Sequence, residues 1–366
     1  MRKYTLNEIT LMQYIFLIHG AQVGTGILSL PRQVAEKSGT DGWVTILVAW
    51  VINCLAGWII LLTLRKYPNF TMLDLFSYLF GKWFGKLLFL PLIAYFAFFG
   101  LDILVNSMLY IKAWFLTKTP GYLVLLLFAI PTYLVVRNGL RVQARYVELV
   151  FYMMLWIPFF LLFPLGRAEP LHLLPVLKEG WGPVLKGLPT TVFAYAGIEV
   201  LFFIHPFLQN KKYAIHGFLI ANTMTMLYYM YVTIVCFVFY TPDGITTLNQ
   251  PVLSLLKNIE FRFLERFDMV ILAFYLFVVS KAWIIYIYCT VFSTSQIRQK
   301  HDHRLHSSIY LLLAIGVVYV VKPTWNQADE WVKLLTRAGM IVMYVLPVLL
   351  YVYVRGFELF RRGKAE

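Results

Sequence analysis

The sequence is poor in charged side chains, because Asp, Glu, Lys and Arg together make up only 14% of its 366 residues. Hydrophobic residues account for 60%, and the mean hydropathy is +0.71. A soluble domain needs many more polar side chains to cover its surface, so this composition excludes a soluble globular protein. Apolar runs of about 20 residues, the length that crosses a bilayer as a helix, recur along the chain. The sequence therefore predicts a polytopic membrane protein surrounded by the lipid bilayer.

Cysteine is also scarce. The three cysteines, Cys54, Cys236 and Cys289, each fall within an apolar segment, which excludes the disulfide framework of a small secreted protein. The net charge of +14 is spread over the connections between apolar segments. Because these basic residues form no single stripe, we interpret them as topology signals and expect no nucleic-acid partner.

The residue patterns of an active site are missing as well. No nucleophile–base pair and no cluster with metal-ligand spacing is visible at membrane depth. His301, Asp302, His303 and His306 lie close together in sequence, but we interpret this short basic connection as a solvated surface and not as a metal site. We therefore predict a protein that is not an enzyme and that needs no cofactor and no metal.

What the sequence does contain is a series of long apolar segments. They predict an all-α polytopic membrane protein of about ten transmembrane helices, although nine or eleven crossings also fit the pattern. We expect residues 1–366 to form a single transmembrane domain, since no connection is long enough to fold alone. The expected segments are 9–36, 43–64, 87–111, 121–136, 146–165, 187–208, 215–240, 269–293, 307–321 and 338–354.

The distribution of Lys and Arg indicates the orientation. Most of them fall in the N-terminal segment, the C-terminal tail and the connections that lie on the same side as these ends. Cytoplasmic connections carry this excess, so we expect both termini in the cytoplasm. The two longest connections, 166–186 and 241–268, then lie outside, and they are either short amphipathic helices or plain loops.

Two of the apolar segments are interrupted by small residues. The first contains Gly24-Thr25-Gly26-Ile27-Leu28-Ser29-Leu30-Pro31, and the sixth contains Phe193-Ala194-Tyr195-Ala196-Gly197-Ile198-Glu199. Such breaks free main-chain groups that lipid cannot satisfy. One break in each half of the chain is typical of secondary transporters built from two inverted repeats, with the substrate between half-helices. We therefore expect helices 1 and 6 to be broken, with repeats at about 9–165 and 187–355.

The breaks also suggest what they bind. Free amides around Gly24 and Gly26, at the positive end of a half-helix, suit a carboxylate, although glycines in membrane helices also serve close packing. Carbonyl groups freed at Ala194 and Gly197 would accept hydrogen bonds from an ammonium group. Glu199 follows immediately, and a carboxylate at membrane depth is a functional candidate.

Two further charges lie at membrane depth. Asp102, with Asn106 one turn later, gives the third segment a polar stripe, and Lys281 stands in the middle of the eighth. A lone buried lysine must be paired or deprotonated. One interpretation is a salt bridge from Lys281 to Asp102 or Glu199 that fixes helix register. The other is that these residues respond to a proton or to ligand arrival.

The interrupted strings resemble the first- and sixth-helix signatures of the amino acid, polyamine and organocation transporter superfamily. More narrowly, the whole chain is similar to the spore germination permease family, the B subunits of nutrient germinant receptors. Leu6-Asn7-Glu8-Ile9, Leu30-Pro31-Arg32 and Asp41-Gly42-Trp43 carry this likeness, together with the length and the compact layout.

This resemblance implies a fold of five plus five helices. It implies that Gly24, Thr25 and Gly26 hold a carboxylate and that Ala194, Tyr195 and Gly197 hold an amine. It further implies germinant-receptor A and C subunits as partners, the spore inner membrane as location, and a function in sensing a small nutrient, for which an amino acid is the favoured candidate. The alternative function is proton-coupled amino acid transport, with Glu199 or Lys281 carrying the proton.

Overall fold

The computed structural model describes residues 7–259, 261, 266–298 and 302–362. The first half of the chain forms α1 (Leu11–Gln22), η2 (Thr25–Leu28), α2 (Leu30–Ser38), η3 (Gly39–Asp41), α3 (Gly42–Lys66), α4 (Met72–Phe80), α5 (Lys82–Trp114), α6 (Gly121–Val136), α7 (Leu140–Met153), α8 (Ile157–Phe160) and η4 (Phe163–Arg167). The second half begins with η5 (Pro170–Leu173) and continues with α9 (Trp181–Tyr195), η6 (Ile198–Val200), α10 (Leu201–Ile204), η7 (His205–Phe207), η8 (Lys211–Tyr213), α11 (Ala214–Phe239), α12 (Pro242–Thr246), α13 (Pro251–Leu256), α14 (Phe267–Ile297), α15 (His303–Val321), α16 (Trp325–Met340), the π-helical turn η9 (Ile341–Val345) and α17 (Leu346–Arg362).

All ten apolar segments expected from the sequence are helical. By length and hydropathy alone, seven helices among the described residues could cross a membrane, or eight if the bent pair at 181–195 and 198–207 counts as one span. The shortfall from ten comes from α1, which has 12 residues before its break, and from α6, which has 16. The protein is an integral membrane protein.

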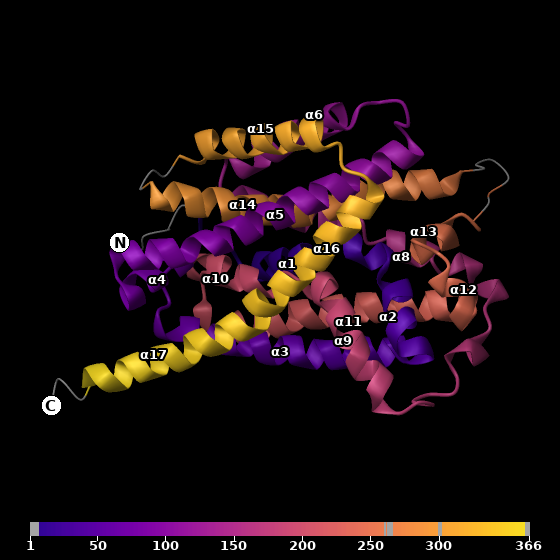
Figure 1. The fold of residues 1–366 in the computed structure, drawn as a ribbon, viewed down its shortest axis with the longest axis horizontal. Helices are drawn as coiled ribbons and strands as arrows, with labels where there is room; N and C mark the ends of the chain where they lie inside the picture. The colour runs from indigo at the N-terminus through magenta and orange to yellow at the C-terminus, as the bar shows by residue number, and fades with distance from the viewer. Residues whose placement is uncertain (1–6, 260, 262–265, 299–301, 363–366) are drawn as a thin grey trace.

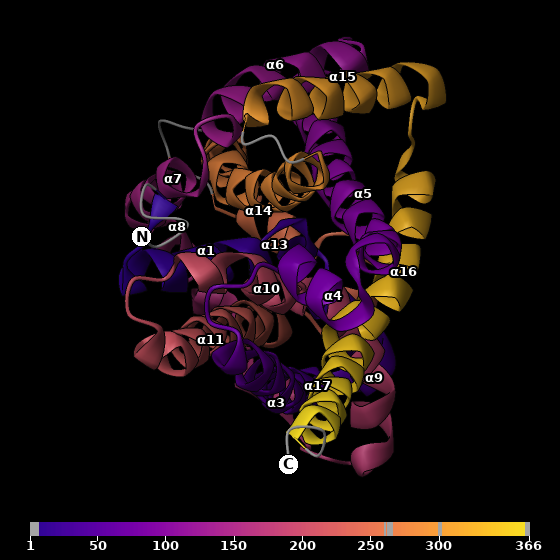
Figure 2. The ribbon, with the colours of Figure 1, turned by 90° about the vertical axis from the view of Figure 1, so that its left-hand side faces the viewer.

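The helices run roughly along one direction, and the broken helices lie inside the bundle. Viewed along that direction in Figure 2, α1 and α10 are surrounded by α3, α11, α14, α5 and α7. In the most apolar stretch of each helix, 72% of α14 and 61% of α5 is buried inside the protein, whereas only 22% of α15 is buried. Helices α5 and α14 therefore line the centre together with the breaks, and α15 lies at the periphery.

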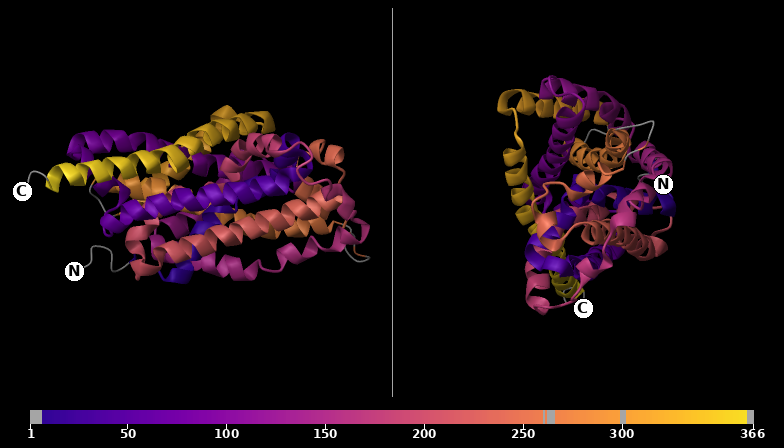
Figure 3. Two further views of the ribbon diagram at one scale, coloured as in Figure 1. Left: turned by 90° about the horizontal axis from the view of Figure 1, so that it is seen from below. Right: turned by 90° about the vertical axis from the view of Figure 1, so that its right-hand side faces the viewer.

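The two ends of the chain lie at the same end of the bundle. In Figure 1 and in the left view of Figure 3 the N and C marks are both at the left, and Figure 1 shows α12 and α13 at the opposite end. This arrangement agrees with an even number of crossings. Which end faces the cytoplasm stays a prediction from the charge distribution.

Short helices complete the connections. Within 241–268, α12 and α13 are the short helices that the sequence suggested, whereas 166–186 holds two short 3-10 turns before α9 begins. The sequence interpretation missed α4, because a helix of 9 residues is too short for a search based on spans. Its signal was a capping box, in which Thr71 Oγ1 accepts from the Asp74 amide and the Asp74 carboxylate accepts from the Thr71 amide.

Candidate functional site

The first break lies where α1 ends. The chain leaves helical geometry at Val23 and Gly24, whose ψ angles are 90° and −146°. The 3-10 helix η2 follows, and α2 resumes with Pro31 in its first turn, where a proline removes no helical hydrogen bond. Among the described residues, the amides of Thr25 and Gly26 have no main-chain partner. The predicted break is therefore present, with two free amides at the start of a short helix.

The second break lies between α9 and η6, where the helix axis bends by 48°. Ala196 is extended, with a ψ angle of 137°, and Gly197 has a φ angle of +131°. Side chains rarely adopt that φ angle, so the position favours glycine. The predicted break of helix 6 is present at this pair of residues.

The two breaks touch each other. A Cβ atom added to Gly197 would lie 3.0 Å from the main-chain nitrogen of Gln22 and 3.1 Å from the carbonyl carbon of Ala21. A Cβ added to Gly26 would lie 3.1 Å from the Phe193 ring. Glycine at both positions thus allows the main chains to approach closely, as expected for half-helices that share one site.

Tyrosine hydroxyls from α11 and α14 satisfy several of the carbonyls that the breaks release. The Tyr229 hydroxyl lies 2.7 Å from the Gln22 carbonyl oxygen and 2.6 Å from that of Ala194, so it bridges both breaks. The Tyr275 hydroxyl donates to the Gly24 carbonyl at 2.7 Å. These carbonyls are therefore stabilised by the protein itself, which explains how the breaks persist away from water.

Gln22 holds the first break against its neighbours. Its Nε2 donates to Asn222 Oδ1 at 3.1 Å and to the Tyr195 carbonyl at 3.4 Å, and its Oε1 accepts from Thr225 Oγ1 at 2.7 Å. Thr225 Oγ1 in turn lies 3.0 Å from His19 Nδ1. This buried network ties α1, α9 and α11 together.

Glu199 is fully buried and is held by three donors. Its Oε1 accepts from the hydroxyls of Tyr95 at 3.1 Å and Tyr286 at 2.7 Å, and its Oε2 accepts from the Gly197 amide at 2.8 Å. The carboxylate thus connects the second break to α5 and α14. Among the described residues it forms no ion pair with Lys281.

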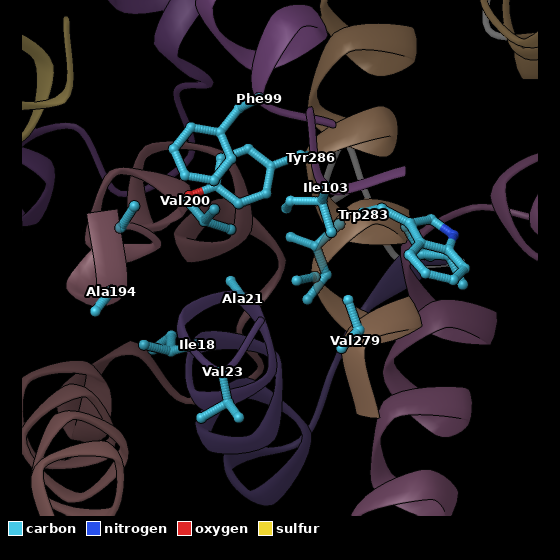
Figure 4. Close-up of a cluster of buried hydrophobic side chains, with 14 of the residues drawn as sticks. Ile18, Ala21, Val23, Phe99, Ile103, Ala194, Val200, Val279, Trp283 and Tyr286 are labelled. Carbon is cyan, nitrogen blue, oxygen red and sulfur yellow. The ribbon is translucent and has the colours of Figure 1, made fainter. Parts of the chain in front are cut away.

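Aromatic rings fill the space where the sequence interpretation placed a cavity between the breaks. Phe99 of α5 stacks on Phe193 with ring centroids 5.1 Å apart and on Tyr286 at 4.3 Å. Figure 4 shows Phe99 and Tyr286 together above Val200, with Ile103 next to Tyr286. A cavity of about 10 Å³ lies next to Thr25, and this is about the room that one water molecule needs. A nutrient at the breaks therefore requires these rings to move.

Asp102 and Lys281 lie apart. The ammonium nitrogen of Lys281 is 6.0 Å from the centre of the Phe151 ring, and its aliphatic stem passes close to Gly20. The carboxylate oxygens of Asp102 have no hydrogen bond among the described residues, and Asn106 Nδ2 donates to the main-chain oxygen of Asp102 at 3.0 Å. The structure thus does not bring Lys281 together with Asp102.

The remaining site residues expected from the sequence are Ala194, Tyr195 and the histidines near residue 301. Ala194 contributes its carbonyl. The Tyr195 ring packs edge-on against Tyr229 with ring centroids 5.4 Å apart, and its hydroxyl donates to the Ile46 carbonyl at 3.2 Å. His301 lies outside the described residues, and no cluster of three metal-ligating side chains occurs within the part of the chain that the structure describes. Tyr229, Tyr275 and Tyr286 were missed, because a tyrosine in an apolar helix is usually a packing residue.

A comparison with models of known protein families identifies the family of this chain. The family model described as spore germination protein matches residues 8–330. The chain belongs to this family.

Members of the spore germination family resemble the chain over most of its length. Spore germination protein YndE of Bacillus subtilis (strain 168) is 27% identical, with 94% of this chain and 96% of the relative covered. GerQB of Bacillus cereus is 26% identical, covering 74% of this chain and 75% of the relative, and spore germination protein A2 of B. subtilis is 26% identical, covering 96% of each.

Solved structures share the fold of this spore germination protein. MhsT, solved in complex with L-phenylalanine, matches with a TM-score of 0.66 at 12% identity, covering 94% of this chain and 87% of MhsT. The nucleobase-cation symporter Mhp1 matches with a TM-score of 0.62 at 9% identity, covering 96% and 79%. These matches confirm the predicted all-α fold with two inverted halves and broken helices 1 and 6. Mhp1 is described as a transporter of the nucleobase-cation-symport-1 family.

Proposed function

We propose that this chain is a germinant-receptor permease-like subunit that binds a small nutrient at the two breaks. The observation that carries the proposal is the contact between the breaks, where Gly197 lies against Gln22 and where the amides of Thr25 and Gly26 remain without main-chain partners. Two free amides at a helix start suit a carboxylate. The surrounding Phe99 and Phe193 rings suit an apolar side chain.

The ligand that fits this chemistry best is a small apolar amino acid. Its carboxylate would bind to the free amides of Thr25 and Gly26, next to Gly24, whose own amide donates to the Gln22 carbonyl at 3.0 Å. Its ammonium group would share the carbonyls at Ala194, Tyr195 and Gly197. Glu199 would hold the second break in shape through Tyr95, Tyr286 and the Gly197 amide. That MhsT was solved with L-phenylalanine bound supports an amino acid as the ligand class.

Binding would act by shifting a conformational equilibrium. Because the Phe99 ring stack closes the space between the breaks, a ligand must bind better to a conformation in which the rings have moved apart. The A and C subunits of a germinant receptor, in the spore inner membrane, would detect that conformation. This relay needs no sustained movement of the nutrient across the membrane.

Proton-coupled amino acid transport is the second candidate function, since the fold is shared with symporters. Uptake into proteoliposomes that contain this chain alone separates the two. We expect radiolabelled alanine and phenylalanine to reach no higher level than in protein-free vesicles, with or without an imposed pH gradient. Accumulation above the external concentration, driven by the gradient, would contradict the sensor function and establish transport. A symporter of the same fold, reconstituted in parallel, confirms that the vesicles are tight.

A further inference from the structure

Asp102 is a buried acid that the proposed nutrient site leaves unexplained. It lies in α5 with 0% of its surface exposed, and both of its carboxylate oxygens lack a hydrogen bond among the described residues. The nearest amide, Asn106 Nδ2, donates to the main-chain oxygen of Asp102 instead. Buried carboxylates normally accept several hydrogen bonds, as Glu199 does, so this group needs another explanation.

Within the described part of the chain, Asp102 forms no salt bridge. Arg32 of α2 is occupied by the Glu36 carboxylate at 2.6 Å and by Asn249 Oδ1 at 2.8 Å. The ammonium nitrogen of Lys281 in α14 lies 6.0 Å from the centre of the Phe151 ring. The other ionisable groups on the described elements around Asp102 include the acids Asp74 of α4, Asp268 of α14 and Asp329 and Glu330 of α16. The bases there are Lys82, Lys86 and Lys112 of α5 and Lys333 and Arg337 of α16, and α5 also carries Tyr95 and Tyr110.

The helix packed along α5 carries another acid. Asp329 lies on α16, which contacts α5, so it adds a negative charge on that side of Asp102. Lys333, one of the two basic residues of α16, is exposed and bonded to Glu330 at 2.7 Å. An ionised Asp102 would therefore be shielded from water, with the Asn106 amide beside it but no hydrogen bond to its carboxylate oxygens among the described residues, and with a second acid on the neighbouring helix. A carboxyl group in such surroundings takes up a proton and becomes neutral.

We propose that Asp102 is a proton-binding site, neutral while α5 lies against α16 and ionised when the two helices separate. Two aromatic pairs hold the helices together on either side of it. Phe98 contacts Trp331 with ring centroids 5.5 Å apart, and Tyr110 contacts Trp325 at 5.1 Å. Figure 2 shows α16 along the outside of α5, away from the central helices. A small movement of this peripheral helix would admit water to Asp102 and release its proton.

The site gives the protein a pH dependence that is independent of the ligand. The folded chain holds the proton, whereas the unfolded chain loses it at mildly acidic pH. The stabilisation is therefore present in acid and is lost as the pH rises, since the ionised group must then be buried. High pH should favour the conformation in which α16 has moved away.

Infrared spectroscopy of the full chain in lipid vesicles tests the proposal. Wild type should show the C=O stretching band of a protonated carboxylic acid at neutral pH, and Asp102→Asn should lose that band. Asp329→Asn, which removes the acid of the pair that is nearer to the surface, should keep it. A band that survives in Asp102→Asn, or that is missing from wild type, would overturn the proposal.

Thermal denaturation gives a second readout. Asp102→Asn replaces a neutral acid by a neutral amide of the same shape, so we expect its melting temperature at neutral pH to equal or exceed that of wild type. Its melting temperature should also fall less steeply with rising pH than that of wild type. A loss as large as that of Asp102→Ala, or an unchanged pH slope, would show that the ionised form is the native one.

Discussion

Replacing Glu199 by Ala is expected to lower the free energy of unfolding by about 3 kcal/mol or more. The substitution leaves three buried donors unpaired, namely the hydroxyls of Tyr95 and Tyr286 and the Gly197 amide. Each unsatisfied buried group costs about 1–3 kcal/mol. Glu199→Gln should cost less, because its carbonyl oxygen can still accept. Denaturation of the purified chain, followed by circular dichroism, measures the difference.

The matched control is Glu148→Ala. Glu148 Oε2 accepts from Gln13 Nε2 at 3.1 Å in a partly exposed position, where water can replace the lost partner. We expect a loss of roughly 0.5 kcal/mol or less for this partly exposed pair. Equal losses for Glu148→Ala and Glu199→Ala would contradict the role of Glu199 as the carboxylate that holds the second break.

Gly197→Ala is expected to weaken the response to the nutrient by at least tenfold. At a φ angle of +131° a side chain costs about 1–3 kcal/mol of backbone strain. In addition, the new Cβ atom would lie 3.0 Å from the Gln22 main-chain nitrogen and must push the two breaks apart. The measurement is the dose–response of germination in bacteria that carry the variant. The nutrient concentration that gives half of the response should rise by at least about tenfold, because about 1.4 kcal/mol of backbone strain corresponds to a factor of ten in affinity.

Gly24→Ala is the control that shows whether a side chain added to any glycine of the breaks weakens the response. Gly24 has a negative φ angle, and an added Cβ would meet only Ala282 Cβ, at the ordinary contact distance of 3.6 Å. Its dose–response should stay close to that of wild type. If Gly197→Ala responded as Gly24→Ala does, the close contact of the breaks would have no part in sensing.

The positions of the breaks could be predicted from the sequence, but their surroundings could not. Glycines at 24, 26 and 197 within apolar segments have few explanations other than a bend or a close approach, so the local pattern was sufficient. Tyr229 and Tyr275 reach the breaks from distant helices. Helical periodicity shows which residues share a face of one helix, but not which helix that face will meet.

The charges at membrane depth illustrate the same limit. A cation and two anions in an apolar bundle suggested an ion pair, yet Glu199 is bonded by tyrosines and an amide, and Lys281 lies beside Phe151. Buried hydroxyl and amide groups can stabilise a carboxylate without a cation, and the composition of the sequence does not show which of the two partners it will have. Likewise, the rings of Phe99, Phe193 and Tyr286 fill the centre, because each belongs to a different helix whose packing is set in three dimensions.

The central claim is that the main-chain groups opened by the two breaks hold the nutrient. Thermal denaturation of the purified chain with a panel of amino acids tests it most directly, comparing wild type with Gly24→Leu, which adds a bulky side chain at the first break, next to Ala282 of α14. At a ligand concentration of about 100 times Kd, wild type should gain roughly 2.7 kcal/mol. We expect Gly24→Leu to insert in the membrane and to gain nothing. Equal stabilisation of both proteins by the same amino acid would show that the nutrient binds elsewhere.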